Sequence, residues 1–197
     1  RDPLWSRGLG DVYKRQTLSR KDPAYVGLAK EIHKAQEALM DGKDPVTVKP
    51  ELAEIMDEIH VQFPQAANDN IGFGSTIFAV KPGDGSAREQ AASCQKVLGG
   101  WANIANEYAT KRYRSNLINW GMLPFVIPDG DLPFTNHDYL FFPGIRKAVE
   151  EKVAEITGYV VDADGLKPFT VTLGELTDEE RQIILKGCLI NYNRVEK

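Results

Sequence analysis

The sequence predicts a mixed α/β domain, in which a sheet is flanked by helices. Short runs of β-branched and aromatic residues, such as 76–80, alternate with longer segments of good helix formers. One run is followed directly by a glycine loop and a helical segment, over 83–98. Near the C-terminus, two strand-like runs flank 162–165 (Asp-Ala-Asp-Gly), which favours a β-hairpin.

The composition fits one domain with a small appendage. The chain has 197 residues, of which 42% are hydrophobic and 26% charged, and its formal net charge is −4. An acidic chain gives no reason to expect nucleic acid or an anionic membrane as a partner. No apolar run is long enough to span a bilayer, and we identify no signal peptide. Cys94 and Cys188 are too few for a disulfide scaffold, which favours a reducing cytoplasm.

The first sixteen residues do not fit the segments that follow. Residues 8–16 (Gly-Leu-Gly-Asp-Val-Tyr-Lys-Arg-Gln) look like translated adapter sequence at the end of a metagenomic assembly. We therefore interpret residues 1–16 as a non-native scar, with a genuine flexible N-terminus as the alternative. Residues 17–65 are expected to form a helical lead-in, and residues 66–197 the main domain.

Two amphipathic helices are expected in the lead-in. The first begins at Pro23 and ends at Gly42. Its apolar stripe consists of Tyr25, Leu28, Ile32, Ala35 and Leu39. Residues 46–48 form a linker or an edge strand, and the second helix runs from Pro50 to Pro64. The acidic residues of the second helix favour a solvated face over a metal site: Glu51, Glu54, Asp57 and Glu58.

The main domain alternates strands and helices. Residues 128–143 are rich in Pro, Asp and Gly and predict a long surface loop. Thr177 and Glu180 are spaced as a capping box for the last helix. The other expected elements are strands at 76–80, 101–105 and 123–127, helices at 89–98, 114–120 and 144–152, and hairpin strands at 156–161 and 169–173.

The glycine loop predicts an anion-binding corner. Gly83 and Gly85 permit backbone conformations or close approaches that other residues resist. Ser86 is expected to be the N-cap of the next helix, whose first-turn N–H groups and dipole favour anions. Arg88 adds a planar fork of donors that suits a carboxylate. Because a short glycine motif is a weak signal, an ordinary capped helix is the alternative.

A second motif gives the loop a family context. Residues 83–92 (G-D-G-S-A-R-E-Q-A-A) are followed by 114–124 (R-S-N-L-I-N-W-G-M-L-P). Together they resemble the C-terminal swivel domain of the aconitase and isopropylmalate dehydratase family, which carries a G-x-G-S-S-R-E-H-A loop and an R-S-N-L-x-x-x-G-x-L-P segment. Residues 184–191 also resemble the end of aconitase chains. The resemblance implies the family's swivelling β/β/α fold, a mixed sheet flanked by helices.

The same resemblance implies an iron–sulfur hydro-lyase that dehydrates and rehydrates a hydroxy-carboxylic acid. Ser86 matches the family serine that abstracts the proton beside the carboxylate, and Arg88 matches the arginine that binds the substrate carboxylate. Three positions depart from the family pattern. Ala87 replaces a second serine that contacts substrate, Gln90 replaces a histidine, and Tyr113 replaces another histidine. The change at Ala87 puts citrate and isocitrate in doubt as substrates.

Residues of the second motif are expected to support the site. Arg114, Ser115 and Asn116 should lock their helix against the Ser86 loop, with direct substrate contact as the alternative.

The resemblance also implies that a [4Fe–4S] cluster is held outside this chain. Cys94 and Cys188 are too few and wrongly spaced to hold it, so we expect no metal site here. The chain would then be a fragment joined to cluster-bearing domains 1–3, or a small subunit with a large-subunit partner, and inactive by itself. A non-catalytic domain that binds RNA or protein is the alternative, which the acidic charge disfavours. A phosphate-binding protein is disfavoured because no G-x-G-x-x-G is present.

Overall fold

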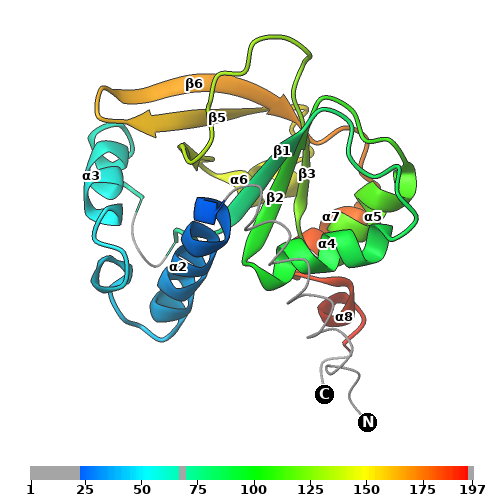
Figure 1. Ribbon diagram of the computed structural model, residues 1–197, viewed down its shortest axis with the longest axis horizontal. Helices are drawn as coiled ribbons and strands as arrows, with labels where there is room; N and C mark the ends of the chain where they lie inside the picture. Colours follow the sequence, from blue (N-terminus) through cyan, green and yellow to red (C-terminus); the bar gives the residue numbers. More distant parts are fainter. Residues whose placement is uncertain (1–22, 67–69, 195–197) are drawn as a thin grey trace.

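The computed structural model describes residues 23–66 and 70–194. Within them lies a six-stranded mixed sheet in the order β1-β2-β3-β6-β5-β4, with helices on both faces (Figure 1). The strands are β1 (Ser75–Ala79), β2 (Gly100–Ala105), β3 (Leu123–Val126), β4 (Tyr139–Phe141), β5 (Glu155–Asp162) and β6 (Gly165–Thr172). The helices are α2 (Pro23–Met40), the 3-10 turn η1 (Pro45–Thr47), α3 (Leu52–Gln62), α4 (Arg88–Val97), α5 (Lys111–Asn119), α6 (Ile145–Glu150), α7 (Asp178–Leu185) and α8 (Leu189–Tyr192).

One half of the sheet is parallel. β1 pairs with β2, and β2 with β3, in the same direction, while α4 and α5 form the two connections. Crossovers between parallel strands are almost always right-handed, so two successive crossovers in one direction place both helices on the same face. Accordingly, α4 and α5 pack against each other on the right of the sheet in Figure 1.

The other half of the sheet is antiparallel. β5 and β6 form a hairpin whose pairs run from Glu155↔Thr172 to Asp162↔Gly165, which confirms the predicted hairpin. Gly165 has φ +108°, a conformation that suits glycine at the turn. β6 joins the parallel half through Val126↔Thr172, and β4 pairs with β5 at the far edge.

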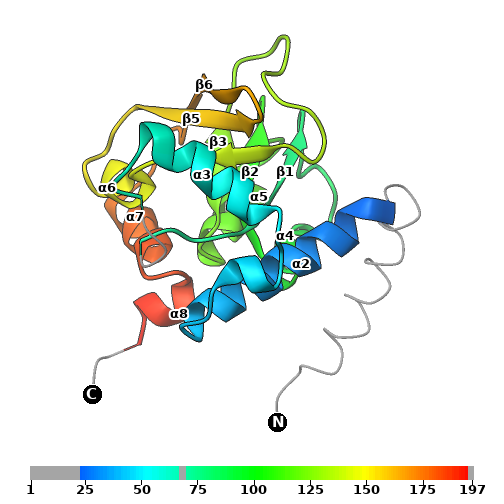
Figure 2. The same ribbon diagram turned by 90° about the vertical axis from the view of Figure 1, so that its left-hand side faces the viewer.

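The opposite face of the sheet is covered by the two lead-in helices. α2 contacts β1, and α3 contacts β5 and β6 (Figure 2). Alternation along β2 distinguishes the two faces, because successive side chains of a strand point to opposite sides. Ile104, 1% exposed, belongs to the main apolar core, whereas Asn103, 2% exposed, donates a hydrogen bond to Tyr113 of α5.

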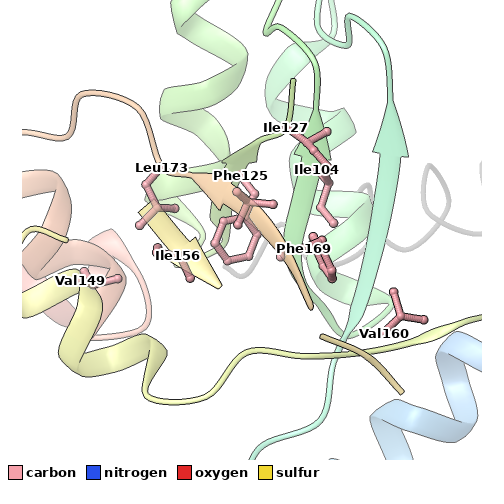
Figure 3. Close-up of a cluster of buried hydrophobic side chains, with 10 residues drawn as sticks. Ile104, Phe125, Ile127, Val149, Ile156, Val160, Phe169 and Leu173 are labelled. Carbon is pink, nitrogen blue, oxygen red and sulfur yellow. The ribbon is translucent and has the colours of Figure 1, made fainter. Parts of the chain in front are cut away.

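The main core lies where the two halves of the sheet meet. Figure 3 shows side chains from β2, β3, the hairpin and α6 converging there. Phe125 is fully buried and stacks on Phe142, with ring centroids 4.6 Å apart, and Phe142 in turn meets the edge of Phe169. Burial of such side chains provides most of the driving force for folding.

An apolar cavity of about 800 Å³ separates α2 and α3 from the sheet. Its walls include Leu28 and Ile32 of α2, Ile55 of α3, and Ile77 and Phe125 of the sheet. The cavity therefore lies on the face opposite to α4 and α5, away from the Ser86 loop.

Most predicted elements of the main domain are confirmed, and two predictions there need correction, at 128–143 and at 114–120. The stretch 128–143 is not only a loop, because Tyr139–Phe141 form β4, an edge strand that pairs with β5. Of the two alternatives for residues 46–48 in the lead-in, the linker holds and the edge strand does not, since Pro45–Thr47 form a 3-10 turn capped by the Asp44 carboxylate. The helix expected at 114–120 begins earlier, at Lys111, because Thr110 caps it.

The predicted apolar stripe of α2 is partly wrong. Of its five members only Ala35 is fully buried. The buried face is instead made of small residues, Val26, Ala29 and Ala38, of which the first two pack against Leu98 at the end of α4. Tyr25, Leu28 and Ile32 line the apolar cavity instead.

Among the described helices, none combines the length and the apolar character that crossing a membrane requires. Residues 1–16, interpreted above as a scar, lie outside the described residues.

Candidate functional site

The Ser86 loop connects the end of β1 to the start of α4. Gly83 has φ +99°, and a Cβ built on it would lie 2.6 Å from Cγ of Tyr113. Both its conformation and the closeness of Tyr113 therefore require glycine, as predicted. Gly85 differs, because its φ is not in the left-handed region and a Cβ there would meet open space. The expectation that Gly85 serves a conformational need is wrong.

Ser86 is not the N-cap of α4. The N-cap is Ala87, with φ −91° and ψ 50°, and no side chain caps the helix. The helix begins one residue later than the sequence pattern predicts, so Ser86 lies in the loop and is exposed. Within the described residues its hydroxyl has no hydrogen-bond partner, and the first-turn N–H groups of α4 lack a side-chain acceptor. Both kinds of group are thus available to an anion.

Arg88 occupies the first position of α4 and is half-buried. One guanidinium nitrogen, Nη2, donates to the Asp84 carbonyl oxygen at 3.5 Å, and the Nε atom is buried without a hydrogen-bond partner. A buried donor without an acceptor is unfavourable. The Nε–H of Arg88 is therefore available to donate a hydrogen bond to an oxygen atom of a ligand.

The beginning of α5 holds the loop from the other side. The Thr110 hydroxyl accepts from the Tyr113 backbone N–H at 3.3 Å and donates to the Gly83 carbonyl oxygen at 3.0 Å. Tyr113 is 3% exposed, and its hydroxyl accepts hydrogen bonds from Gln95 at 2.8 Å and Asn103 at 3.0 Å. Burial raises the pKa of Tyr113, although these two hydrogen bonds act in the opposite direction.

These supporting residues were not identified from the sequence. Thr110 stands three residues before Tyr113, the spacing of an N-cap, and that signal could have revealed it. Gln95 and Asn103 lie on α4 and β2, so only the folded chain brings them to Tyr113.

Arg114 does not point to the Ser86 loop. Its guanidinium donates to the carbonyl oxygens of Leu173 at 2.9 Å and Glu175 at 2.6 Å, after β6. It therefore fastens α5 to the segment that leads to α7, a structural role toward a different part of the chain than expected.

Ser86, Arg88, Ser115 and Asn116 meet in one shallow groove. Its volume is about 350 Å³, and it lies between the N-terminal ends of α4 and α5. The groove thus unites four of the predicted site residues, while Gly83, Gly85, Ala87 and Arg114 do not line it. Its remaining walls are residues that the sequence analysis did not select: Glu89, Lys111 and Arg112.

The described residues do not fit an iron–sulfur cluster. No group of three or more His, Cys, Asp or Glu side chains is arranged there to hold a metal ion. Cys94 is buried in the layer of α4, and Cys188 precedes α8. A cluster of this type needs three or four thiolates converging on one point.

The structure thus combines a mixed α/β sheet with a groove that is lined by a serine and an arginine near the start of a helix. Residues 56–130 match the family model of the aconitase C-terminal domain. The match spans both the Ser86 loop and α5.

One solved structure similar to this chain is 3-isopropylmalate dehydratase (leuD) from Methanocaldococcus jannaschii. It shares 22% sequence identity, covers 71% of this chain and 75% of its own, and superposes with a TM-score of 0.36. A comparison with curated protein sequences finds no match.

Proposed function

We propose that this chain is the swivel part of an iron–sulfur hydro-lyase that dehydrates and rehydrates a hydroxy-carboxylic acid. Ser86 is the base that takes the proton beside the carboxylate, and Arg88 binds that carboxylate. The observation that supports this most is the groove itself, which joins Ser86 and Arg88 inside the stretch that matches the family.

The surroundings of Ser86 favour proton abstraction from an anionic substrate. A serine hydroxyl is a weak proton acceptor in water and needs a cationic, dry environment to act as a base. Arg88, Lys111 and Arg112 supply positive charge around the groove, and the start of α4 supplies N–H donors without a side-chain acceptor. Because Ser86 is exposed in this chain, the bound substrate and an opposing domain must exclude water from it.

The missing half of the site belongs to a partner in this proposal. Activation of the leaving hydroxyl is assigned to a [4Fe–4S] cluster on other domains or on a large subunit. The open groove would face that partner across a cleft. Residues 66–197 form the swivel unit and residues 17–65 its lead-in. Because the two half-sites act together, the chain alone should show no hydratase activity and bind no iron.

Ala87 shapes the substrate preference. It stands where the family has a second serine, and in this fold it is exposed at the N-cap of α4 beside the groove. A missing hydroxyl donor weakens selection for substrates that need it, so an acid other than citrate or isocitrate is favoured.

The test uses this chain joined to cluster-bearing domains or combined with a large subunit. Dehydration of a panel of hydroxy acids is followed by the absorbance of the unsaturated product. Ser86→Ala should lower kcat by about two orders of magnitude or more, with cluster content unchanged. Ser93→Ala is the matched control, because Ser93 lies on the same helix and only donates to the Gln90 carbonyl oxygen. Turnover of Ser86→Ala within a few-fold of the parent enzyme contradicts the proposal.

A further inference from the structure

Ser86 lies in a short exposed segment, residues 84–87, just before α4. Among the described hydrogen bonds, those that reach this segment come from α4 itself, such as the 3.5 Å bond from Arg88 Nη2 to the Asp84 carbonyl oxygen. The position of Ser86 therefore depends on how Gly83, before the segment, and α4, after it, are fixed relative to each other.

Tyr113 of α5 fixes the first end of the segment. Its side chain lies so close to Gly83 that a Cβ built on this glycine would lie 2.4 Å from Cβ of Tyr113. The preceding residue is held as well, because the Pro82 carbonyl oxygen accepts from the Ala109 N–H at 2.9 Å. Together with the Thr110 bond to Gly83, these contacts place the chain against the start of α5 just before the exposed segment.

The hydroxyl of the same tyrosine fixes the second end. It accepts a 2.8 Å hydrogen bond from Gln95 Nε2, and Gln95 lies about two turns after Arg88 on the same face of α4. A second bond, 3.0 Å from Asn103 Nδ2, joins the hydroxyl to β2. Because Tyr113 and Asn103 are buried, these bonds are strengthened by the low polarity around them. One side chain thus contacts both ends of the exposed segment.

We infer that Tyr113 is a positioning residue for the base, because it fixes Gly83 relative to α4 and thereby places the Ser86 hydroxyl beside Arg88. The side chain supports Gly83, and its hydroxyl holds α4 through Gln95. Tyr113 does not line the groove, so it acts through Ser86 and does not touch the substrate itself. This inference rests on the proposed function, since it assumes that Ser86 is the base.

Removal of the hydroxyl separates its role from that of the ring. Tyr113→Phe keeps the packing on Gly83 but leaves the Gln95 and Asn103 amides without this acceptor, which frees α4 to shift. A displacement of about 1 Å at a reacting group can lower a rate by about 100-fold, so we expect kcat to fall by about 10- to 100-fold. KM should change less, because Arg88 lies on α4 itself and still binds the carboxylate.

The test uses the assembled enzyme, with this chain joined to cluster-bearing domains or combined with a large subunit. Tyr113→Phe and Gln95→Met are each measured alone, and Tyr113→Phe also together with Ser86→Ala. Gln95→Met removes one bond of the network from a half-buried position, so it tests the inference even if Tyr113→Phe does not fold. Tyr108→Phe is the matched control, because its partly buried hydroxyl donates to two carbonyl oxygens of β2 and β3.

Both Tyr113→Phe and Gln95→Met should lower kcat, while Tyr108→Phe stays near the parent value. In the Ser86→Ala background, Tyr113→Phe should lower kcat no further. A positioning residue has no effect once the group that it positions is gone, so the two losses should not multiply.

Three results would overturn the inference and leave the proposed function standing. In the first, folded Tyr113→Phe or Gln95→Met keeps the parent's kcat. In the second, the loss in Tyr113→Phe multiplies with that in Ser86→Ala. In the third, Tyr108→Phe loses as much activity as Tyr113→Phe, which would show a general effect of losing a phenol hydroxyl. If Ser86→Ala itself keeps the parent's kcat, the proposed function fails and this inference fails with it.

Discussion

The Thr110 hydroxyl donates a 3.0 Å hydrogen bond to the Gly83 carbonyl oxygen, which ties the cap of α5 to the loop that carries Ser86. The Thr110 hydroxyl oxygen also accepts from the Tyr113 N–H, so one side chain caps a helix and positions the loop. Hydrogen bonds of Thr110 therefore connect the two motifs, and a change at the start of α5 should alter the conformation of the loop that carries Ser86.

Removing the Thr110 hydroxyl should lower stability and disturb the loop. Thr110→Val should reduce the free energy of unfolding by about 1 kcal/mol or slightly more, measured by chemical denaturation. Thr177→Val is the matched control, since Thr177 caps α7 in a capping box far along the chain. Both variants should lose similar stability, but only Thr110→Val should shift the NMR signals of Gly83 to Arg88. Unshifted loop signals in Thr110→Val would show that the bond does not position the loop.

The two glycines of the loop should respond very differently to alanine. Gly83→Ala forces a side chain into a left-handed conformation and against Tyr113, and should destabilise the fold by roughly 1–3 kcal/mol. Gly85→Ala enters open space and should change stability by less than about 0.5 kcal/mol. Thermal unfolding of the two variants provides the comparison, and equal melting temperatures would refute this account of the loop.

Arg114 should matter for stability, and its neighbour Arg112 should not. Arg114→Gln breaks two hydrogen bonds from a charged group to the Leu173 and Glu175 carbonyl oxygens, a loss of about 1.5–3 kcal/mol. Arg112→Gln removes an exposed side chain from the same helix and should stay within about 0.5 kcal/mol of the parent. If urea denaturation gives both variants the parent's midpoint, Arg114 does not hold α5 to the segment between β6 and α7.

Acid should destabilise the contact between the lead-in and β4. Burial alone lowers the pKa of Lys49, but hydrogen bonds to Glu51 and Glu31 outweigh it and raise that pKa. The hydrogen bond from Lys49 lowers the pKa of Glu51, which also accepts from Tyr139 at 3.2 Å. A carboxylate with a lowered folded pKa stabilises the fold above its unfolded pKa of about 4.3, and this stability is lost as the pH falls through the folded pKa.

The corresponding experiment compares denaturation midpoints between about pH 6 and about pH 3. Glu51→Gln should flatten the acid decline relative to the parent chain, because the titrating partner of Lys49 is gone. Glu54→Gln, an exposed carboxylate on the same helix, should retain the parent's slope. Identical slopes for all three proteins would contradict the role given to the Glu51 carboxylate.

The elements that carry strong local signals were predicted well. The β1–loop–α4 unit, the hairpin with its 162–165 turn and the Thr177 capping box each depend on residues that are close in sequence. The candidate site was predicted in the same way, since Ser86 and Arg88 belong to one short motif, and the groove does bring them together.

The remaining features depend on contacts between distant segments. Tyr139–Phe141 are residues that favour strands, but the run is only three residues long in a Pro- and Gly-rich background, and it forms a strand by pairing with β5. The buried face of α2 is decided by Leu98, which is distant in sequence. Lys111 and Arg112 enter the groove only because α4 and α5 cross on the same side of the sheet, a consequence of handedness and not of composition.

The apolar cavity between the lead-in helices and the sheet has a consequence for the compressibility of this protein. Hydrostatic pressure favours states in which solvent fills poorly packed apolar space, and this pocket of about 800 Å³ is already partly open to solvent. Moderate pressure should therefore detach α2 and α3 before it disturbs the opposite face. High-pressure NMR would then show lead-in signals vanishing first, while those of α4 and α5 persist in a partly unfolded intermediate.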